Sequence, residues 1–281
     1  MMSSQRTELI NVTQGEAKPI IETNSLTKRF KTLTAVDQLN LSIRTGEMFG
    51  LVGPNGAGKT TVIKMLTTIL SPTSGNAIVA GHDILKHSSQ VRKSIGYVPQ
   101  LLSADGSLTA YENLLIFAKL YHIPRNERNT RIRDALAFMG LAEVADKMVH
   151  DYSGGMIRRL EIAESMLHRP AVLFLDEPTV GLDPVARKAV WDHIRRVRVD
   201  FGTSILLTTH YMEEADELCD RVAIMHLGKV AALGTPAELK ASVGEGATLD
   251  DVFVHFSGYE VDSGGNYREV SRTRRTARRL G

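Results

Sequence analysis

The stretch Gly53-Pro54-Asn55-Gly56-Ala57-Gly58-Lys59-Thr60 matches the pattern Gly-x-x-x-x-Gly-Lys-Thr and follows an apolar, strand-like run, Met48–Val52. Glycine reaches positive φ without strain, and it lets backbone N–H groups approach phosphate oxygens that a Cβ would keep away. A helix that begins at the end of such a loop adds the positive end of its dipole. The stretch therefore predicts a site for the phosphates of a nucleotide, between a strand and a helix.

The last two residues of this loop have separate expected roles. Lys59 can reach the β- and γ-phosphates as a point charge, and the Thr60 hydroxyl can face a magnesium ion bound to them. Residues 59–70 predict an apolar-rich helix closed by Ser71-Pro72. The alternative is a glycine-rich turn without function, but the strand-loop-helix context favours nucleotide contacts from Gly53, Pro54, Asn55, Gly56, Ala57, Gly58, Lys59, Thr60 and Thr61.

The composition excludes several classes of protein. The balance of 43% hydrophobic and 23% charged residues over 281 residues is that of a globular protein. No run approaches the roughly 18 to 20 apolar residues of a membrane span, and the N-terminus lacks the apolar core of a secretory signal. We therefore expect a cytoplasmic protein, in which the single cysteine, Cys219, excludes an internal disulfide.

The net charge of +2 is unevenly distributed along the chain. Residues 268–281 contain six arginines and one glutamate, a charge of +5, so the rest of the chain carries −3. Because the basic character belongs to this terminal segment, the sequence weakens a nucleic-acid-binding interpretation. The low content of large apolar residues predicts that the segment is disordered.

Strand-like and helical segments alternate along the chain, which predicts a parallel sheet with covering helices. Residues 105–150 differ, because the capping box Thr109-Ala110-Tyr111-Glu112 begins a run of helices without strands, an all-helical insertion. Strands are expected at residues 20–24, 39–43, 48–52, 76–79, 94–99, 171–175, 204–209 and 221–226. Helices are expected at residues 59–70, 110–121, 125–139, 156–167, 184–200 and 212–219.

Two acidic residues, Asp176 and Glu177, directly follow the apolar run 171–175. Open α/β sheets bind ligands at the carboxyl ends of their strands. We expect Asp176 to hold Mg²⁺, directly or through water, and Glu177 to orient or deprotonate the water that attacks the γ-phosphate. An ordinary turn at a strand end is the alternative, which the phosphate loop upstream disfavours.

A histidine, His210, follows the predicted strand 204–209. Its ring can donate a hydrogen bond to the γ-phosphate and so respond to its presence. We expect His210 to lie beside the two acidic residues, at the same edge of the sheet.

In the order and spacing of its motifs, the chain resembles the ATP-binding subunit of an ATP-binding-cassette (ABC) transporter over residues 22–235. The phosphate loop (Walker A) and the strand ending at Asp176 (Walker B) are common to P-loop NTPases. What distinguishes this family is Ser153-Gly154-Gly155, which matches its signature motif ahead of a helix. Gln100 matches its Q-loop glutamine, 181–184 its D-loop and His210 its switch histidine.

The resemblance implies ATP and Mg²⁺ as cofactors and assigns roles to the matched positions. Catalytic roles are implied for Lys59, Glu177 and His210. Metal contacts are implied for Thr60, Gln100 and Asp176. Further nucleotide contacts are implied for Phe30, Gln100, Ser153, Gly154, Gly155 and Asp183.

The implied fold is α/β, with a RecA-like P-loop NTPase core built on a mainly parallel sheet. An N-terminal antiparallel β subdomain and an inserted α-helical subdomain complete it. We expect a disordered N-terminus at 1–20, an ATP-binding domain at 21–235 with its helical subdomain at about 101–160, a C-terminal helical extension at 236–260 and a basic disordered tail at 261–281.

The chain departs from the common Leu-Ser-Gly-Gly-Gln signature at two flanking positions, Tyr152 and Met156. The central residues are intact, and Ser153 can cap the following helix and present N–H groups to phosphate. Phe30 occupies the position where the family places an aromatic residue that stacks on adenine. Phenylalanine keeps the stacking surface, although an aromatic residue in a short strand is also a common core residue.

The Tyr-Ser-Gly-Gly-Met form resembles the drug-export branch of the family, typified by daunorubicin-resistance ATPases. Segments 234–239 and 248–253 also match that branch. The second segment begins with a capping box, and its apolar positions are expected to pack on the core or on a partner: Leu249, Val252, Phe253 and Phe256.

The resemblance implies a head-to-tail dimer in which each ATP lies between the phosphate loop of one copy and Ser153-Gly154-Gly155 of the other. It also implies separately encoded multi-span permease subunits, which hold the chain on the inner face of the cell membrane, and export of a drug, antibiotic or other hydrophobic compound.

The sequence leaves four alternatives to compare with this interpretation. The first is an ABC exporter of polysaccharide or lipid. The next two are soluble ABC ATPases. Those that act on ribosomes carry two cassettes in one chain, and those that act on DNA carry a long coiled-coil insertion. This sequence has one phosphate loop and a short insertion without heptads, which disfavours both. The signature and switch motifs disfavour the fourth, a P-loop kinase.

Overall fold

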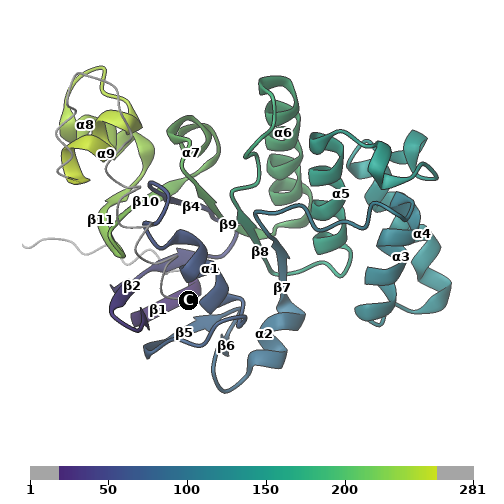
Figure 1. Cartoon of the computed structure of the whole chain (residues 1–281), viewed down its shortest axis with the longest axis horizontal. Helices are drawn as coiled ribbons and strands as arrows, with labels where there is room; N and C mark the ends of the chain where they lie inside the picture. The colour runs from purple at the N-terminus through teal and green to yellow at the C-terminus, as the bar shows by residue number, and fades with distance from the viewer. Residues whose placement is uncertain (1–18, 258–281) are drawn as a thin grey trace, which may run out of the picture.

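A computed structural model of the chain describes residues 19–257 (Figure 1). The tail expected at 261–281 lies outside the described residues, as does most of the N-terminal segment expected to be disordered, 1–20. The expected disorder is wrong for Pro19 and Ile20, because they begin the first strand, β1 (Pro19–Phe30), which pairs through Pro19 with Arg44. The strand expected at 20–24 already includes Ile20.

A six-stranded sheet forms the centre of the described fold, with the strand order β11-β10-β4-β9-β8-β7 (Figure 1). Strands β10, β4, β9, β8 and β7 are parallel, and β11 pairs antiparallel with β10 at one edge. Every residue of β4, β8 and β9 is buried, as expected of parallel strands covered on both faces. The bounds are β4 (Met48–Val52), β7 (Ile95–Val98), β8 (Val172–Asp176), β9 (Ser204–Thr209), β10 (Arg221–His226) and β11 (Lys229–Gly234).

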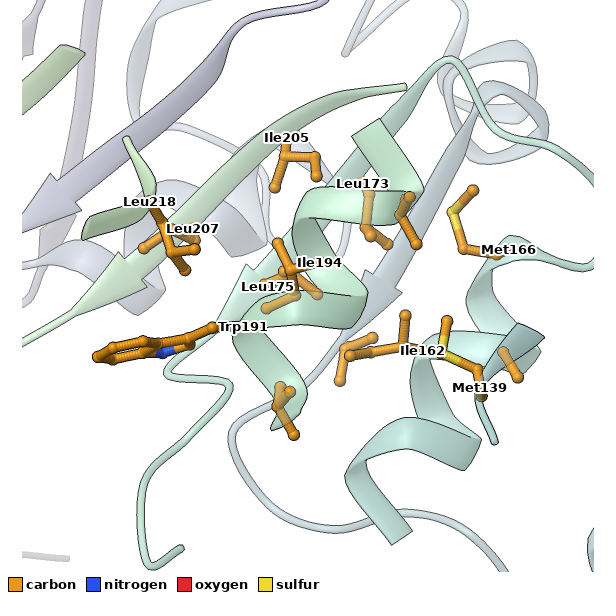
Figure 2. Close-up of a cluster of buried hydrophobic side chains, with 14 of the residues drawn as sticks. Met139, Ile162, Met166, Leu173, Leu175, Trp191, Ile194, Ile205, Leu207 and Leu218 are labelled. Carbon is orange, nitrogen blue, oxygen red and sulfur yellow. The ribbon is translucent and has the colours of Figure 1, made fainter. Parts of the chain in front are cut away.

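Alternate residues of the central strands enter two separate hydrophobic cores. On one face, Leu173 and Leu175 of β8 pack with side chains of α5 (Gly154–Met166) and α6 (Pro184–Phe201), as Figure 2 shows for Ile162 and Ile194. On the other face, residues of the same strands pack beneath α1 (Lys59–Leu66) and the second sheet. This alternation is the period-two pattern of a strand buried on both sides.

The second sheet is antiparallel and consists of β1, β2 (Leu33–Leu39), β3 (Ser42–Arg44), β5 (Ser74–Val79) and β6 (His82–Asp83). The single strand expected at 39–43 is wrong: β2 ends at Leu39 and β3 begins at Ser42. Between them, the Leu41 N–H donates to the Thr23 hydroxyl (2.7 Å). The strand expected at 20–24 is too short, since β1 continues to Phe30.

The remaining helices include α3 (Ala110–Leu120) and α4 (Arg125–Phe138). Figure 1 places them at the opposite end of the described fold from α8 (Pro236–Val243) and α9 (Leu249–Ser257). The expected capping box is present: the Thr109 hydroxyl accepts from the Glu112 N–H (3.1 Å), and the Glu112 carboxylate accepts from the Thr109 N–H (2.8 Å). The other elements are α2 (Ser88–Ser94), η1 (Ala142–Val144), η2 (Val149–Asp151) and α7 (Met212–Leu218).

Two helix predictions need correction. The helix expected at 59–70 ends at Leu66, because Thr68 adopts a positive φ of 63° that a right-handed helix cannot contain. The strand expected at 94–99 begins one residue later, since Ser94 ends helix α2, which was not predicted.

The C-terminal helix packs largely as expected. Leu249 and Val252 are buried in the core, and Phe253 is partly buried against it. Phe256 remains 38% exposed. Among residues 19–257, no helix is both long enough and apolar enough to cross a membrane.

Candidate functional site

The phosphate loop joins β4 to α1, and its three glycines all adopt positive φ: 153° at Gly53, 88° at Gly56 and 106° at Gly58. A Cβ at Gly58 would lie 2.3 Å from the Ala35 carbonyl oxygen, and one at Gly53 would lie 2.3 Å from the Met225 carbonyl oxygen. A Cβ at Gly56 would meet no atom within 4 Å. The loop is therefore held closely at both ends while its middle faces open space.

The Lys59 side chain turns back along this loop. Its ammonium donates to the carbonyl oxygens of Gly53 (2.6 Å) and Pro54 (3.1 Å), and it lies 3.3 Å from the Glu177 carboxylate. Burial lowers the pKa of Lys59, and the neighbouring Glu177 charge opposes that shift. Lys59 is thus a buried cation placed between the loop and the end of β8.

Asp176 ends β8 and is 1% exposed. One of its oxygens accepts hydrogen bonds from the hydroxyls of Thr60 (3.1 Å) and Thr208 (2.6 Å). Burial raises the pKa of Asp176, while these two hydrogen bonds oppose the shift. The structure therefore brings together the threonine of the phosphate loop and the first acidic residue.

Glu177 is the point at which the other predicted site residues meet. One carboxylate oxygen lies near Lys59, and the other accepts from the Gln100 side-chain amide (3.3 Å) and lies 3.2 Å from Nδ1 of His210. Glu177 also adopts a positive φ of 51°, which is unusual for a residue with a side chain. Hydrogen bonds from its own N–H to the carbonyl and hydroxyl oxygens of Thr208, each 3.0 Å long, hold this conformation.

These side chains converge because β4, β8 and β9 are parallel neighbours, and β7 lies beside β8. Lys59, Glu177 and His210 follow the carboxyl ends of three of these strands, and Gln100 follows the fourth. The carboxyl edge of a parallel sheet is where α/β proteins bind ligands.

The donor set fits a nucleotide with a magnesium ion. The open middle of the loop, at Gly56, leaves room for phosphate oxygens, and Lys59 provides a buried positive charge. Thr60 and Asp176 provide hard oxygen ligands side by side. Within the described part of the chain, no group of three or more His, Cys, Asp or Glu side chains could hold a metal ion by itself. Mg²⁺ is usually bound by one or two carboxylates together with substrate phosphates.

The signature residues lie at the start of α5. The Ser153 hydroxyl caps α5 by accepting from the Met156 N–H (3.3 Å), as expected. A Cβ at Gly155 would lie 2.9 Å from Cβ of Ala186 in α6, so glycine permits the close packing of the two helix starts. Among residues 19–257, no hydrogen bond or ion pair joins Ser153 to Lys59, Asp176 or Glu177.

Asp183 caps the neighbouring helix α6. Its carboxylate accepts from the N–H groups of Val185 (3.0 Å) and Ala186 (2.9 Å). Leu182, in the same loop, lies against the signature, since a Cβ at Gly154 would be 3.2 Å from its side chain. The signature and the D-loop are thus one packed surface.

Phe30 ends β1 and is 44% exposed, with the Lys28 ammonium 5.2 Å from the centre of its ring. It belongs to the β1–β2 hairpin, and β2 contains Ala35, whose carbonyl crowds Gly58. An exposed aromatic ring on a hairpin that touches the phosphate loop is not a core residue.

Sequence reasoning missed Thr208. Its hydroxyl donates to Asp176 and accepts from the Glu177 N–H, so one side chain orients both acidic residues. The only available signal was its place in the last residues of a predicted strand beside a predicted site.

Comparisons with known proteins agree with this arrangement. The pattern of the family described as "ABC transporter" matches residues 36–180. The chain is 46% identical over 224 residues to the daunorubicin/doxorubicin resistance ATP-binding protein DrrA of Streptomyces peucetius, covering 80% of this chain and 68% of that protein. It is 43% identical to the daunorubicin resistance ATP-binding protein DrrA3 of Streptomyces coeruleorubidus, covering 81% of this chain and 72% of that one.

A solved structure described as the ATP binding subunit of an ABC transporter superposes with a TM-score of 0.75 at 28% identity, covering 84% of this chain and 99% of that chain. The predicted fold class, a P-loop NTPase core with a mainly parallel sheet, is therefore confirmed. The match to the family pattern and the identity over 68% of the DrrA relative lead to one conclusion: the chain belongs to the ABC transporter family and is an ATP-binding ATPase.

Proposed function

We propose that this ATPase powers the export of a drug, an antibiotic or another hydrophobic compound through separately encoded multi-span membrane subunits. The 46% identity to a daunorubicin/doxorubicin resistance ATP-binding protein supports this substrate class. The Tyr-Ser-Gly-Gly-Met form of the signature, which resembles that of the drug-export branch, supports it as well. The membrane subunits would hold the chain at the inner face of the cell membrane.

The ATP-binding domain would comprise residues 21–235, with a helical subdomain at about 101–160 and a C-terminal extension at 236–260.

The observation that carries the proposed mechanism is the meeting of Lys59, Gln100 and His210 at the Glu177 carboxylate. Glu177 orients a water molecule and accepts its proton as the water attacks the γ-phosphorus. The bond from that phosphorus to the bridging oxygen breaks, and the electron pair leaves with ADP. Lys59 holds the phosphate oxygens, and His210 donates a hydrogen bond to the γ-phosphate.

Thr60 and Asp176 would hold Mg²⁺, with Gln100 as a further ligand. Bound there, Mg²⁺ neutralises charge on the β- and γ-phosphates. The backbone of residues 53–61 would surround the phosphates, and Phe30 would stack on the adenine ring.

Ser153, Gly154 and Gly155 would bind the γ-phosphate of the nucleotide held by a second copy of the chain, with Asp183 beside them. Two features support this arrangement. Ser153 is exposed at the start of α5, where backbone N–H groups and the helix dipole favour an anion. No hydrogen bond or ion pair joins it to its own phosphate loop among the described residues, and a nucleotide between two copies would use both surfaces.

The test is export by the assembled transporter. The chain would be produced with the multi-span protein encoded beside it in a daunorubicin-sensitive host, and drug accumulation would be measured. We expect the wild-type chain to lower drug accumulation in the host. The Glu177→Gln chain should not lower it. Equal accumulation with both chains would reject drug export while leaving the ATPase assignment intact.

A further inference from the structure

Helix α5 contains a buried ion pair that the proposed chemistry does not use. Arg158 and Glu161 lie three residues apart, with Nη1 and Oε2 separated by 2.9 Å and both side chains 2% exposed. Burying two charges costs desolvation energy that their mutual attraction often fails to offset, so such a pair is weak support for stability alone. Its contacts indicate what else it does.

Both members of the pair bind the backbone of the segment that carries Gln100. The Arg158 guanidinium donates to the carbonyl oxygens of Pro99 (2.7 Å) and Gln100 (2.9 Å). The Glu161 carboxylate accepts from the N–H and the hydroxyl of Ser103. The pair therefore holds residues 99–103 at both ends, through three backbone atoms of the segment and the Ser103 hydroxyl.

The segment has little other support. Gln100, Leu101, Leu102 and Ser103 are all exposed, and Leu101 is 81% exposed, so no apolar side chain anchors this stretch in the core. Yet the side-chain amide of Gln100 donates to Glu177. The hydrogen bonds from α5 are thus the main restraint on the backbone from which Gln100 reaches the site.

We propose that Arg158 and Glu161 are positioning residues that hold Gln100 against Glu177 and thereby tie the signature helix to the hydrolytic site of the same chain. This proposal rests on the proposed function of Gln100 and Ser153. Ser153 caps the helix on which Arg158 and Glu161 lie five and eight residues further on, roughly 8 to 12 Å along its axis. Ile162 and Met166 fix the same helix to the core (Figure 2).

The consequence is communication between the two nucleotides of a dimer. A nucleotide bound by Ser153 belongs to the partner copy, whereas Gln100 serves the nucleotide of its own chain. A shift of α5 on meeting the partner's nucleotide therefore moves the backbone of Gln100, because the helix and the segment are joined by four hydrogen bonds.

Two variants separate positioning from folding. Arg158→Lys keeps the positive charge beside Glu161 but loses the planar fork that reaches two carbonyls. The double variant Arg158→Met with Glu161→Leu removes both charges together, which avoids leaving one buried charge unpaired. The matched control is Arg159→Lys, since Arg159 is the adjacent arginine and donates to the Met139 carbonyl (2.8 Å), away from the segment.

The first readout is amide hydrogen exchange over residues 100–104 of the full-length chain, which requires no activity. Exchange there is expected to rise by about tenfold in both variants and to stay unchanged in Arg159→Lys. Wild-type exchange rates in the double variant would overturn the proposal. The exchange rates can be compared even if the wild-type chain does not hydrolyse ATP. Such a lack of hydrolysis would count against the proposed function and not against this proposal.

The second readout is a double-mutant cycle with Gln100→Ala. We expect Arg158→Lys to lower kcat by about fivefold or more while the Kd for ATP stays within about twofold, because the contact acts on the hydrolytic step. In the Gln100→Ala background the same substitution should cause no further loss. An equal loss in both backgrounds would mean that Arg158 acts through the fold in general, and the proposal would fail.

Discussion

Lys59 Nζ lies 3.3 Å from a Glu177 carboxylate oxygen, and each of the two side chains is only 4% exposed. Hydrogen bonds to the carbonyls of Gly53 and Pro54 occupy the remaining positions around the ammonium, whose three protons are then all directed to oxygen. The cation that is to hold phosphate and the carboxylate that is to receive a proton are therefore direct neighbours. Removing Lys59 leaves the buried Glu177 carboxylate with only Gln100 and His210 as side-chain partners, and removing Glu177 takes the ion-pair partner from the buried ammonium.

Lys59→Ala should abolish ATP turnover, because the phosphates lose their charged partner. Affinity for ATP should also fall, by about tenfold or more, which corresponds to roughly 1.4 kcal/mol or more. Phosphate release and equilibrium binding of ATP to the purified chain would measure both effects. Lys64→Ala is the matched control, since Lys64 lies on the exposed side of the same helix. Turnover by the Lys59 variant at the control rate would contradict the assignment.

Glu177→Gln should separate binding of ATP from its hydrolysis. Glutamine keeps the size and the hydrogen-bonding oxygen of the side chain but cannot take a proton, while Asp176 is untouched. ATP should therefore bind and remain intact. If ATP joins two copies through Ser153, the variant should elute as a dimer with ATP and Mg²⁺ in size-exclusion chromatography with light scattering.

The control for this dimer is Ser153→Arg added to Glu177→Gln. The larger side chain crowds the start of α5, so the double variant should bind ATP and stay monomeric. A Glu177→Gln chain that binds ATP but remains monomeric, both alone and in the assembled transporter, would reject the two-copy site.

The elements that the sequence predicted well are those with a strong local signal. The strands at 204–209 and 221–226 have the predicted bounds, because continuous apolar runs mark buried parallel strands. Helix α2 was missed, since it buries only Val91 and no side chain caps its first turn. Strand β11 was missed because alternate partly buried residues at the edge of the sheet give a weak pattern.

The site could be predicted as a set of residues, but its geometry could not. Spacing along the chain identified Lys59, Gln100 and Glu177. The contact between Gln100 and Glu177 spans 77 residues and depends on β7 lying beside β8, a sheet order that local patterns do not contain. The ion pair of Arg158 and Glu161 was also missed, since charged residues on a helix normally indicate a solvent-exposed face.

Gly58→Ala should destabilise the fold by several kcal/mol. It places a Cβ at 2.3 Å from a backbone oxygen, at a φ of 106° that residues with side chains rarely adopt. Gly56→Ala is the matched control: its φ of 88° is also strained, but the new Cβ meets no atom within 4 Å. The free energy of unfolding of Gly56→Ala should fall by only about 1 kcal/mol, because of backbone strain. Urea unfolding without nucleotide would measure the loss of stability in both variants. Equal losses would show that the clash with the Ala35 carbonyl is relieved, which would contradict the prediction for Gly58→Ala.

Glu164 should make stability depend on pH in the range from about 5 to 8. Its side chain is 3% exposed, and one oxygen has no hydrogen-bond partner among the described residues. Burial raises the pKa of Glu164 to about 8, and the neighbouring charge of Glu161 adds to the shift. The ring of Tyr121 also lies close enough for the Glu164 charge to raise the pKa of its hydroxyl, which is already raised by burial.

The sign of this effect follows from proton binding. Between pH 4.5, the ordinary pKa, and about 8, the folded chain keeps a proton on Glu164 that the unfolded chain has lost. The contribution to stability is complete below pH 4.5 and decreases as pH rises towards 8, by at most about 1.4 kcal/mol per pH unit.

Glu164→Gln stays neutral at every pH and should lack this decrease. The stability of the variant relative to wild type should therefore increase by about 3 kcal/mol from pH 5 to 7.5 in urea unfolding. Glu143→Gln, at an exposed position of η1, should show no such trend. A difference between Glu164→Gln and wild type that is the same at all pH values would show that the buried carboxyl does not hold its proton.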